Sequence, residues 1–318
     1  MMDCKITIVG AGITGLACAQ RLVRDGYTPL VLDKGRGIGG RIATRRVMLP
    51  DGAIGFDHGA QYLTARDRAF AAALQGLGSA SAVWCDGAAE PHLVGVPGMS
   101  SLPRSLANGL DVQLGKEVTA MRAVQGGWEL DLSQMRVQSH HLVITVPAPQ
   151  AAALLGTDHA LHSRIAKIAM APCLTLMAAL PGDAPRPFVS RVSDDHPLAW
   201  IAQNSTKPGR AGVFTTWVAQ AGAEWSERHL EETPEIIAAR MLPMLAEVIG
   251  VAPQSAVYAS AHRWRYAQTI APLGAPFLCS NDATLFVGGD WCLGARVEAA
   301  WLSGTAIAQA IIDQSRRL

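Results

Sequence analysis

The sequence has little charge and no long hydrophobic run. Charged residues make up 17% of the 318 residues, and the formal net charge is +1. The two signs are interspersed, so the chain offers no basic field that would attract nucleic acid or an anionic membrane. No run approaches the roughly 18 apolar residues of a membrane span, and the start of the chain lacks the basic region of a signal peptide. We therefore expect no nucleic-acid or membrane partner.

Cysteine is scarce and scattered. The six cysteines form no CxxC motif and have no histidine partners at metal-ligand spacing. This pattern predicts reduced thiols in a cytoplasmic protein, and no metal site. Hydrophobic residues, by contrast, account for 49% of the chain, so a large core is expected. A size of about 150 residues per domain predicts two domains.

The first forty residues carry a dinucleotide-binding pattern. An apolar, β-branched run ends at Val9 and leads into the glycine-rich turn GAGITG, followed by a helical stretch and a second apolar run that ends at Asp33. Gly10 permits the sharp turn, Gly12 lets the backbone approach a pyrophosphate, and Gly15 lets the helix pack close to the strand. The helix N-terminus attracts the anion, and Asp33 can accept hydrogen bonds from ribose hydroxyls.

A glycine pair and an arginine lie just beyond the second strand, in the segment KGRGIGGR at 34–41. A simple NAD site does not need them. Arg41 can form a charge-assisted hydrogen bond to a phosphate held near the first turn. The alternative is a flexible surface loop with a solvated arginine.

Two later segments combine polar and aromatic residues. Residues 57–62, DHGAQY, are typical of backbone that approaches something flat, or of an ordinary turn with a half-buried tyrosine. On the predicted strand at 262–266, His262, Trp264 and Tyr266 share one face because side chains alternate along a strand. Such a stripe of rings forms either core or one wall of a pocket for a flat substrate.

A second anchor for a ligand lies near the C-terminus. The apolar run LFVGGD ends at Asp290, and a helix with small residues on one face begins near Val297. A carboxylate at a strand end and a second helix N-terminus suggest a cofactor long enough to need two anchors. This arrangement indicates FAD rather than NAD alone.

The rest of the chain predicts alternating helices and strands. We expect helices over 67–82, 100–108, 150–155, 159–170 and 233–249, and strands within 84–95, 111–146, 173–180, 198–203 and 213–219. Ser100 is a candidate N-cap, and His140 and His141 are expected at the surface. Asn204 and Lys207 lie in a polar turn, where they serve either loop formation or a substrate site.

Taken together, these motifs resemble a family of flavoproteins. GAGITG, GGR at 39–41, GAQY at 59–62 and GGD before a small-residue helix are similar to the monoamine-oxidase and polyamine-oxidase superfamily. Within it, the segments DKGRGIGGR, DHGAQYLTARD, VPGMS, QNSTKPGR, HRWRYA and GDWCLGARVEAAWLSG resemble bacterial renalase-like proteins. The motifs span nearly the whole chain.

The resemblance implies an α/β fold: a glutathione-reductase-like, Rossmann-type FAD domain with an interleaved α+β substrate domain that carries a mixed sheet. It places residues 1–60, 96–149 and 256–318 in the FAD domain and residues 61–95 and 150–255 in the substrate domain. The implied FAD is noncovalently bound. Its implied contacts are Gly10, Gly12, Ile13, Thr14, Gly15, Asp33, Lys34, Arg36, Gly40, Arg41, Gly59, Ala60, Gln61, Tyr62, Val118, Gly289, Asp290 and Val297.

The implied activity is oxidation of the 2- and 6-dihydro isomers of NAD(P)H to NAD(P)+, by hydride transfer to flavin N5 with reduction of O2 to H2O2. Tyr62, Asn204, His262 and Trp264 are the candidates for the catalytic pocket over the flavin. Two alternatives remain open: an amine oxidase or desaturase of the same fold, and a noncatalytic FAD-binding protein. We expect a monomer or weak dimer.

Overall fold

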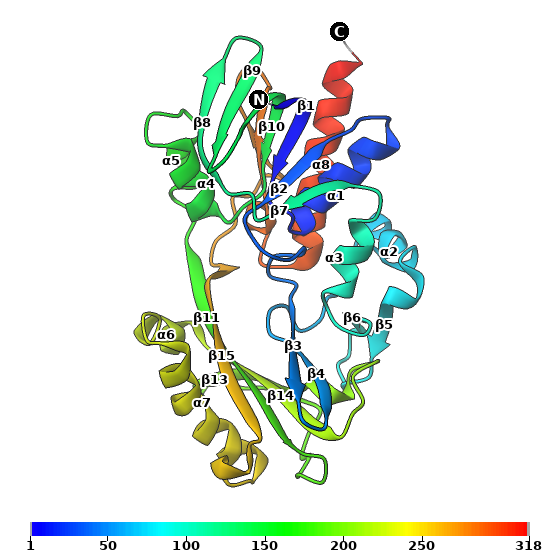
Figure 1. Ribbon diagram of the computed structural model, residues 1–318, viewed down its shortest axis with the longest axis vertical. Helices are drawn as coiled ribbons and strands as arrows, with labels where there is room; N and C mark the ends of the chain where they lie inside the picture. The colour runs from blue at the N-terminus through cyan, green and yellow to red at the C-terminus, as the bar shows by residue number, and fades with distance from the viewer. Residues whose placement is uncertain (1, 317–318) are drawn as a thin grey trace.

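The computed structural model describes residues 2–316 and contains two main sheets, in the upper and lower halves of Figure 1. The first sheet has eight strands and contains the path β16-β17-β10-β1-β2-β7. These strands are β1 (Met2–Val9), β2 (Leu30–Asp33), β7 (Asp111–Leu114), β10 (Arg136–Ile144), β16 (Leu278–Cys279) and β17 (Leu285–Val287). The four neighbouring pairs from β17 to β7 are parallel, whereas β16 pairs antiparallel to β17.

Both faces of the first sheet are covered. Side chains such as Ile8 pack against α1 (Ile13–Arg24) and α8 (Val297–Ser315), while Val9 faces the opposite cluster. That second cluster contains side chains of α4 (Ala148–Leu155) and of the hairpin β8 (Val118–Val124) and β9 (Gly127–Leu132), which extends from β10. Burial on both sides explains why the central strands are continuously apolar.

The second sheet has five strands in the order β12-β13-β14-β11-β15, and all its pairings are antiparallel. They are β11 (Met170–Pro181), β12 (Ser190–Val192), β13 (Leu198–Gln203), β14 (Phe214–Ala221) and β15 (Tyr258–Thr269). Helices α6 (Ala223–Arg228) and α7 (Pro234–Ile249) pack on one face. The hairpin β3 (Thr44–Leu49) and β4 (Gly52–Asp57) packs on Met177 and Val218.

The α/β fold class with a Rossmann-like sheet is therefore confirmed, and the mixed pairing lies in the first sheet. The long strands β11 and β15 reach from the lower sheet toward the upper one (Figure 1). The exact division into two domains stays a prediction. No helix within residues 2–316 combines the length and apolar character that crossing a membrane requires.

Two predicted helices are wrong in length. The helix expected over 67–82 is α2 (Arg68–Gln75), because Gly76 and Gly78 follow it and the chain then pairs as β5 (Ser81–Trp84) with β6 (His92–Gly95). The helix expected over 159–170 is the single turn α5 (His162–Ile165). After residues 166–169 the chain enters β11, where pairing with β15 supplies the backbone hydrogen bonds.

Two residue-level expectations are also wrong. His141 is buried, since it shares a strand face with Val143 and that face is covered by α1 and α8. Ser100 precedes α3 (Ser101–Leu106) but makes no capping hydrogen bond, because its own backbone is already helical.

Candidate cofactor and substrate site

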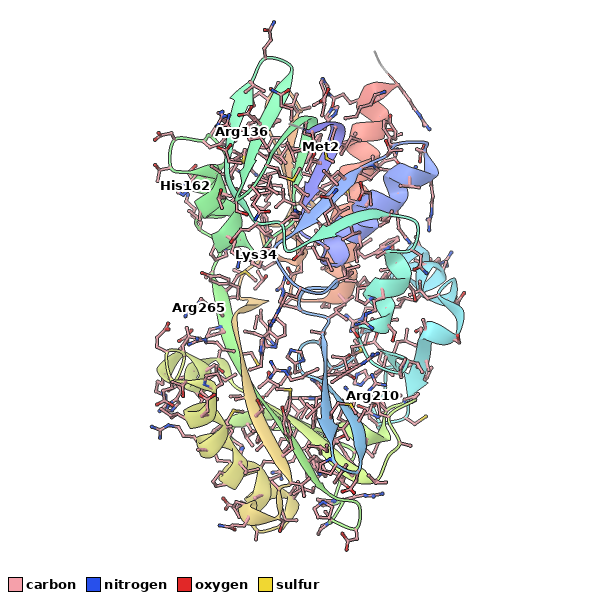
Figure 2. The ribbon with its side chains drawn as sticks, viewed as in Figure 1. Met2, Lys34, Arg136, His162, Arg210 and Arg265 are labelled. Carbon is pink, nitrogen blue, oxygen red and sulfur yellow. The ribbon has the colours of Figure 1, made fainter. Side chains whose placement is uncertain are left out.

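A cavity of about 1340 Å³ is lined by residues from both sheets. It lies at the carboxyl ends of β1, β2, β10 and β17, where ligands bind in open parallel sheets, and continues to β13 and β15 of the second sheet. Lys34, which follows β2 of the first sheet, and Arg265, on β15 of the second sheet, both line the cavity and are labelled in Figure 2. The volume exceeds the roughly 300–1,000 Å³ of a typical single-ligand pocket. The cavity thus has room for a long cofactor and a substrate together.

The glycine-rich turn forms one end of this cavity. Gly10 has φ +112°, and a Cβ there would meet the Thr145 hydroxyl oxygen at 2.7 Å, so only glycine fits. Gly12 is the N-cap of α1 and no side chain caps the helix, which leaves the first N–H groups of α1 directed at the cavity. A Cβ on Gly12 would meet nothing within 4 Å. This end is a ready site for a pyrophosphate.

Asp33 is held rigidly at the tip of β2. One carboxylate oxygen accepts a hydrogen bond from the Ala11 N–H at 2.6 Å, and the other accepts one from the Gly35 N–H at 2.6 Å. Asp33 also lines the cavity. These backbone bonds fix the carboxylate where the sequence predicts a ribose contact.

The structure brings Arg41 and Asp290 together, although they are far apart in sequence. The guanidinium donates two hydrogen bonds to the carboxylate, at 2.6 Å and 2.9 Å, and a third to the Ala267 carbonyl at 3.0 Å. Both side chains line the cavity. The two predicted anchors therefore orient each other at one place in its wall.

The second helix N-terminus opens on the same cavity. Val297 begins α8 and lines the cavity, and no side chain caps this helix. α8 lies along α1 so closely that a Cβ on Gly304 would stand 2.1 Å from the Thr14 carbonyl oxygen. The buried Glu298 carboxylate accepts hydrogen bonds from the N–H groups of Arg66 and Asp67, each at 2.6 Å. The predicted convergence of two helix starts is thus confirmed.

Most of the predicted cofactor residues line this cavity. They are Gly10, Gly12, Ile13, Thr14, Asp33, Lys34, Gly40, Arg41, Gly59, Ala60, Gln61, Tyr62, Val118, Asp290 and Val297.

Three predicted contacts do not line the cavity. Gly15 packs under the turn, where a Cβ would stand 2.0 Å from the Gly10 carbonyl oxygen. Arg36 is exposed, and the Gly289 N–H donates to the Ser303 hydroxyl at 3.0 Å. The structure therefore assigns Gly15 and Gly289 to packing and removes Arg36 from the wall.

A wall of rings stands at the other end of the cavity. His262 and Trp264 are in edge contact, with ring centroids 4.3 Å apart, and Trp264 stacks on His58 at 5.3 Å. The Trp264 indole N–H donates to the His58 carbonyl at 2.7 Å, which fixes the indole plane. Burial, assisted by nearby positive charge, lowers the pKa of both His58 and His262 to about 4. Both imidazoles are therefore neutral at physiological pH.

Tyr62 belongs to a second aromatic group that sequence reasoning missed. Its ring stacks on His92 with centroids 3.5 Å apart and lies 5.4 Å from Trp200, and all three line the cavity. His92 Nδ1 is 2.9 Å from the Asp86 carboxylate. Burial raises the pKa of Tyr62, and the acidic neighbours add to this. No local pattern marks His92 or Trp200, because only the folding of the β5–β6 hairpin and of β13 brings them to Tyr62.

The prediction that Asn204 shapes the pocket is wrong. Its side chain is fully buried, donates to the Gly55 carbonyl at 2.8 Å and accepts from the Asp57 N–H at 3.2 Å. It ties the turn after β13 to β4 and does not line the cavity. Its role is loop formation, the alternative reading of its sequence context.

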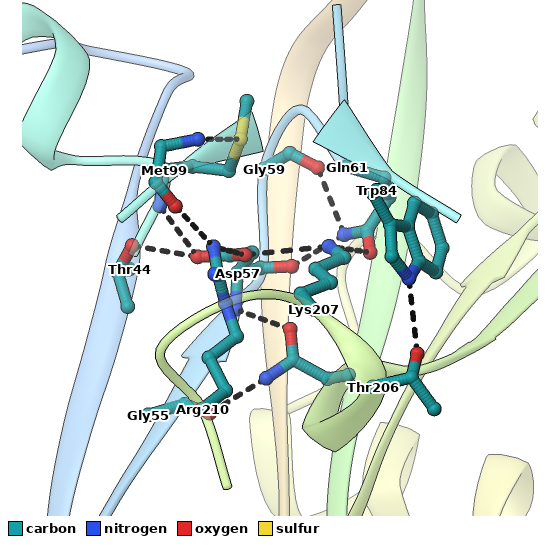
Figure 3. A network of polar contacts seen from close by, with 12 residues as sticks. Thr44, Gly55, Asp57, Gly59, Gln61, Trp84, Met99, Thr206, Lys207 and Arg210 are labelled. Atoms are coloured by element: carbon teal, nitrogen blue, oxygen red, sulfur yellow. Dashed lines mark hydrogen bonds and ion pairs between the residues drawn. The ribbon is translucent and has the colours of Figure 1, made fainter. Parts of the chain in front are cut away.

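Asp57 lies at the centre of a buried ionic network (Figure 3). Its carboxylate pairs with Lys207 at 3.3 Å and Arg210 at 2.5 Å, and it accepts hydrogen bonds from the Met99 N–H and the Thr44 hydroxyl. Burial favours the neutral acid, but the two cations outweigh it and hold the pKa of Asp57 below its usual value. No pattern in the sequence indicates that Lys207 is buried.

The carboxylates around the cavity are all engaged within the described residues. Asp33 is bound by backbone N–H groups and Asp290 by Arg41. Glu90 pairs with Arg66 at 2.9 Å, and Glu117 pairs with Lys34 at 3.7 Å. Asp33 and Asp290 are thus held in place, whereas Glu90 and Glu117 are 39% and 61% exposed and belong to weak surface pairs.

Comparison with known proteins agrees with this geometry. A family model described as flavin containing amine oxidoreductase matches residues 83–312, and one described as an NAD(P)-binding Rossmann-like domain matches residues 8–76. Renalase from Mus musculus is 25% identical, over 91% of this chain and 95% of that protein.

Solved structures share the fold. Cyclohexylamine oxidase from Brevibacterium oxydans IH-35A has a TM-score of 0.78 at 14% identity, covering 99% of this chain and 100% of that chain. A proposed protoporphyrinogen oxidase from Exiguobacterium sp. 255-15 has a TM-score of 0.79 at 13% identity, covering 97% of this chain and 98% of that chain.

Proposed function

The chain belongs to the flavin containing amine oxidoreductase family and uses FAD as its cofactor, and from this premise we propose that it is a renalase-like oxidase. Its proposed substrates are the 2- and 6-dihydro isomers of NAD(P)H, which it oxidises to NAD(P)+. The full-length similarity to a renalase supports this choice within the family. Noncovalent binding of FAD, a cytoplasmic location and a monomer or weak dimer are parts of the same proposal.

The observation that carries the proposal is the aromatic wall of the cavity at β15, where His262 and Trp264 are in edge contact. The wall is neutral at His262, and the two rigidly held lining acids, Asp33 and Asp290, are already bonded to backbone N–H groups and to Arg41. A dihydronicotinamide ring is flat, uncharged and already electron-rich. The wall suits such a ring.

The residues of the chain have limited but definite tasks in this reaction. The uncapped starts of α1 and α8 present N–H groups and the positive ends of their dipoles to the cofactor. When bound, FAD supplies the hydride acceptor and passes the electrons to O2, which yields H2O2. Tyr62, His262 and Trp264 hold the substrate ring against the cofactor and exclude water. No residue has to act as a nucleophile or base.

Anaerobic mixing tests the proposal. The purified holoprotein is mixed with the dihydro isomers obtained by borohydride reduction of NAD+ and of NADP+, and separately with amines such as cyclohexylamine and putrescine and with protoporphyrinogen. We expect the dihydro isomers to bleach the flavin absorbance rapidly and to give H2O2 when air is admitted. If only an amine or only protoporphyrinogen bleaches the flavin, the protein is instead an amine oxidase or a desaturase of the same fold. A flavin that no compound bleaches would indicate a noncatalytic FAD-binding protein.

A further inference from the structure

Two cations, Lys207 and Arg210, share the single carboxylate of Asp57 behind one wall of the cavity. The side chains of Asp57 and Lys207 are fully buried, and that of Arg210 is 4% exposed. Arg210 lies closer to Asp57 than Lys207 does, and it would neutralise the carboxylate by itself. Burying the Lys207 ammonium as a second cation costs free energy that a single buried ion pair would avoid. The position of Lys207 therefore calls for a second role.

The Lys207 ammonium is linked to the cavity through a single side chain (Figure 3). Its Nζ donates to Gln61 Oε1 at 3.2 Å and lies 5.1 Å from the centre of the Trp84 ring. The Gln61 amide nitrogen donates to the carbonyls of Asp57 and Gly59, so the orientation of the amide is fixed. Gln61 lines the cavity. The ammonium thus stands one side chain behind the wall.

That wall is also rigid. A Cβ on Gly59 would stand 1.9 Å from the Arg41 carbonyl oxygen, so the backbone at Gly59 packs against the backbone at Arg41 more closely than any other residue would permit. The Gln220 side chain donates to the Gly59 carbonyl at 2.8 Å, and Trp264 contacts the preceding residue. A charge behind such a wall keeps a fixed distance from whatever lies in the cavity.

We propose that Lys207 is a positioning residue that sets the reduction potential of the bound flavin through its buried positive charge. A hydride carries two electrons and one proton, so the cofactor that accepts it gains one negative charge. Lys207, acting through the Gln61 amide, favours this anionic form over the oxidised form. The inference rests on FAD occupying the cavity as proposed above, but not on the identity of the substrate.

The charge state of Lys207 depends on groups from several elements. Burial lowers the pKa of Lys207 to about 8, and the positive charge of Arg210 on the same loop lowers it further. The carboxylates of Asp57 on β4 and Asp86 in the β5–β6 loop act in the opposite direction and raise it. Most Lys207 side chains are therefore protonated at neutral pH. Because coupling is reciprocal, an anionic cofactor raises the proton affinity of Lys207 by the same free energy. When the flavin is reduced above about pH 8, Lys207 should therefore take up an additional proton.

Two measurements on the holoprotein test this proposal, and neither needs a substrate. Sulfite adds to oxidised flavin and leaves it negatively charged, so the sulfite Kd, read from bleaching, reports positive charge nearby. Lys207→Met should weaken sulfite binding about tenfold and lower the midpoint potential. Lys167→Met removes one exposed charge from the segment before β11 and should leave both quantities unchanged.

The second measurement follows the midpoint potential of the wild-type protein between about pH 6 and about pH 10. We expect its slope to steepen from about one proton per two electrons to about two, in a window that begins near pH 8. A sulfite Kd for Lys207→Met within twofold of wild type overturns the proposal, and so does a constant slope in the wild type. If Lys207→Met does not retain FAD, the wild-type slope alone decides. Failure to oxidise any dihydronicotinamide would overturn the proposed function and leave this test intact.

Discussion

The convergence of two helix N-termini on one cavity depends on a single glycine, and replacing it gives the sharpest prediction. Gly304 is the point at which α8 crosses α1, and a Cβ there would stand 2.1 Å from the Thr14 carbonyl oxygen. Ordinary contacts of this kind are longer than about 3.4 Å, so the helices must separate by more than about 1 Å. Thr14 lies in the first turn of α1, beside the predicted pyrophosphate site.

The magnitude follows from two opposing terms. Alanine favours a helix over glycine by about 1 kcal/mol, whereas overpacking a tight contact costs about 1–3 kcal/mol and here falls at the upper end because the obstacle is backbone. Gly304→Ala should therefore lower the free energy of unfolding of the apoprotein by about 2 kcal/mol. It should also weaken FAD binding, since the shift of α1 displaces the N–H groups that face the cofactor.

Gly12→Ala is the matched control. A Cβ there meets nothing within 4 Å and points to space beside the helix start, so the apoprotein should keep its stability within about 0.5 kcal/mol while FAD binding weakens. Urea unfolding of the apoproteins and titration with FAD measure the two effects separately. A Gly304→Ala protein that is as stable as wild type and binds FAD equally well would refute the reasoning about helix packing.

Three further predictions concern ionisable side chains. Arg41→Ala leaves the Asp290 carboxylate without its bidentate partner and should reduce FAD affinity at least tenfold in an equilibrium titration, whereas unchanged affinity would remove both residues from the cofactor site. Asp57→Asn leaves two buried cations without their anion and should cost about 3–5 kcal/mol of unfolding free energy; a loss below about 1 kcal/mol in urea unfolding would show that the network adapts. Because the pKa of Asp57 is held low in the folded protein, its contribution is present above the unfolded pKa and is lost as the pH falls through the lower folded value. The pKa values of His58 and His262 are lowered to about 4, so the unfolded chain binds more protons between about pH 4 and about pH 6.5; stability should fall with decreasing pH across this window, and replacing both residues with Phe should flatten the profile.

Local sequence patterns predicted the parts of the site that depend on backbone. The strand, glycine turn and helix up to Asp33 and the helix that begins at Val297 lie where expected. Glycine positions and apolar periodicity carry this information because they act within a few residues. The predicted helix at 67–82 is too long because Gly76 and Gly78 follow α2 and the chain then forms the β5–β6 hairpin, and the one at 159–170 shortens to a single turn before the chain enters β11.

The sequence alone predicted a long dinucleotide cofactor with two anchors, because the glycines and acids that such a cofactor requires are encoded next to the strands that carry them. Only the tertiary structure paired Arg41 with Asp290, brought His92 and Trp200 to Tyr62, and buried Lys207 beside Asp57. These contacts join residues far apart in the chain, and burial and charge pairing arise only when the sheets pack together. The electrostatic character of the cavity is for that reason a property of the folded protein.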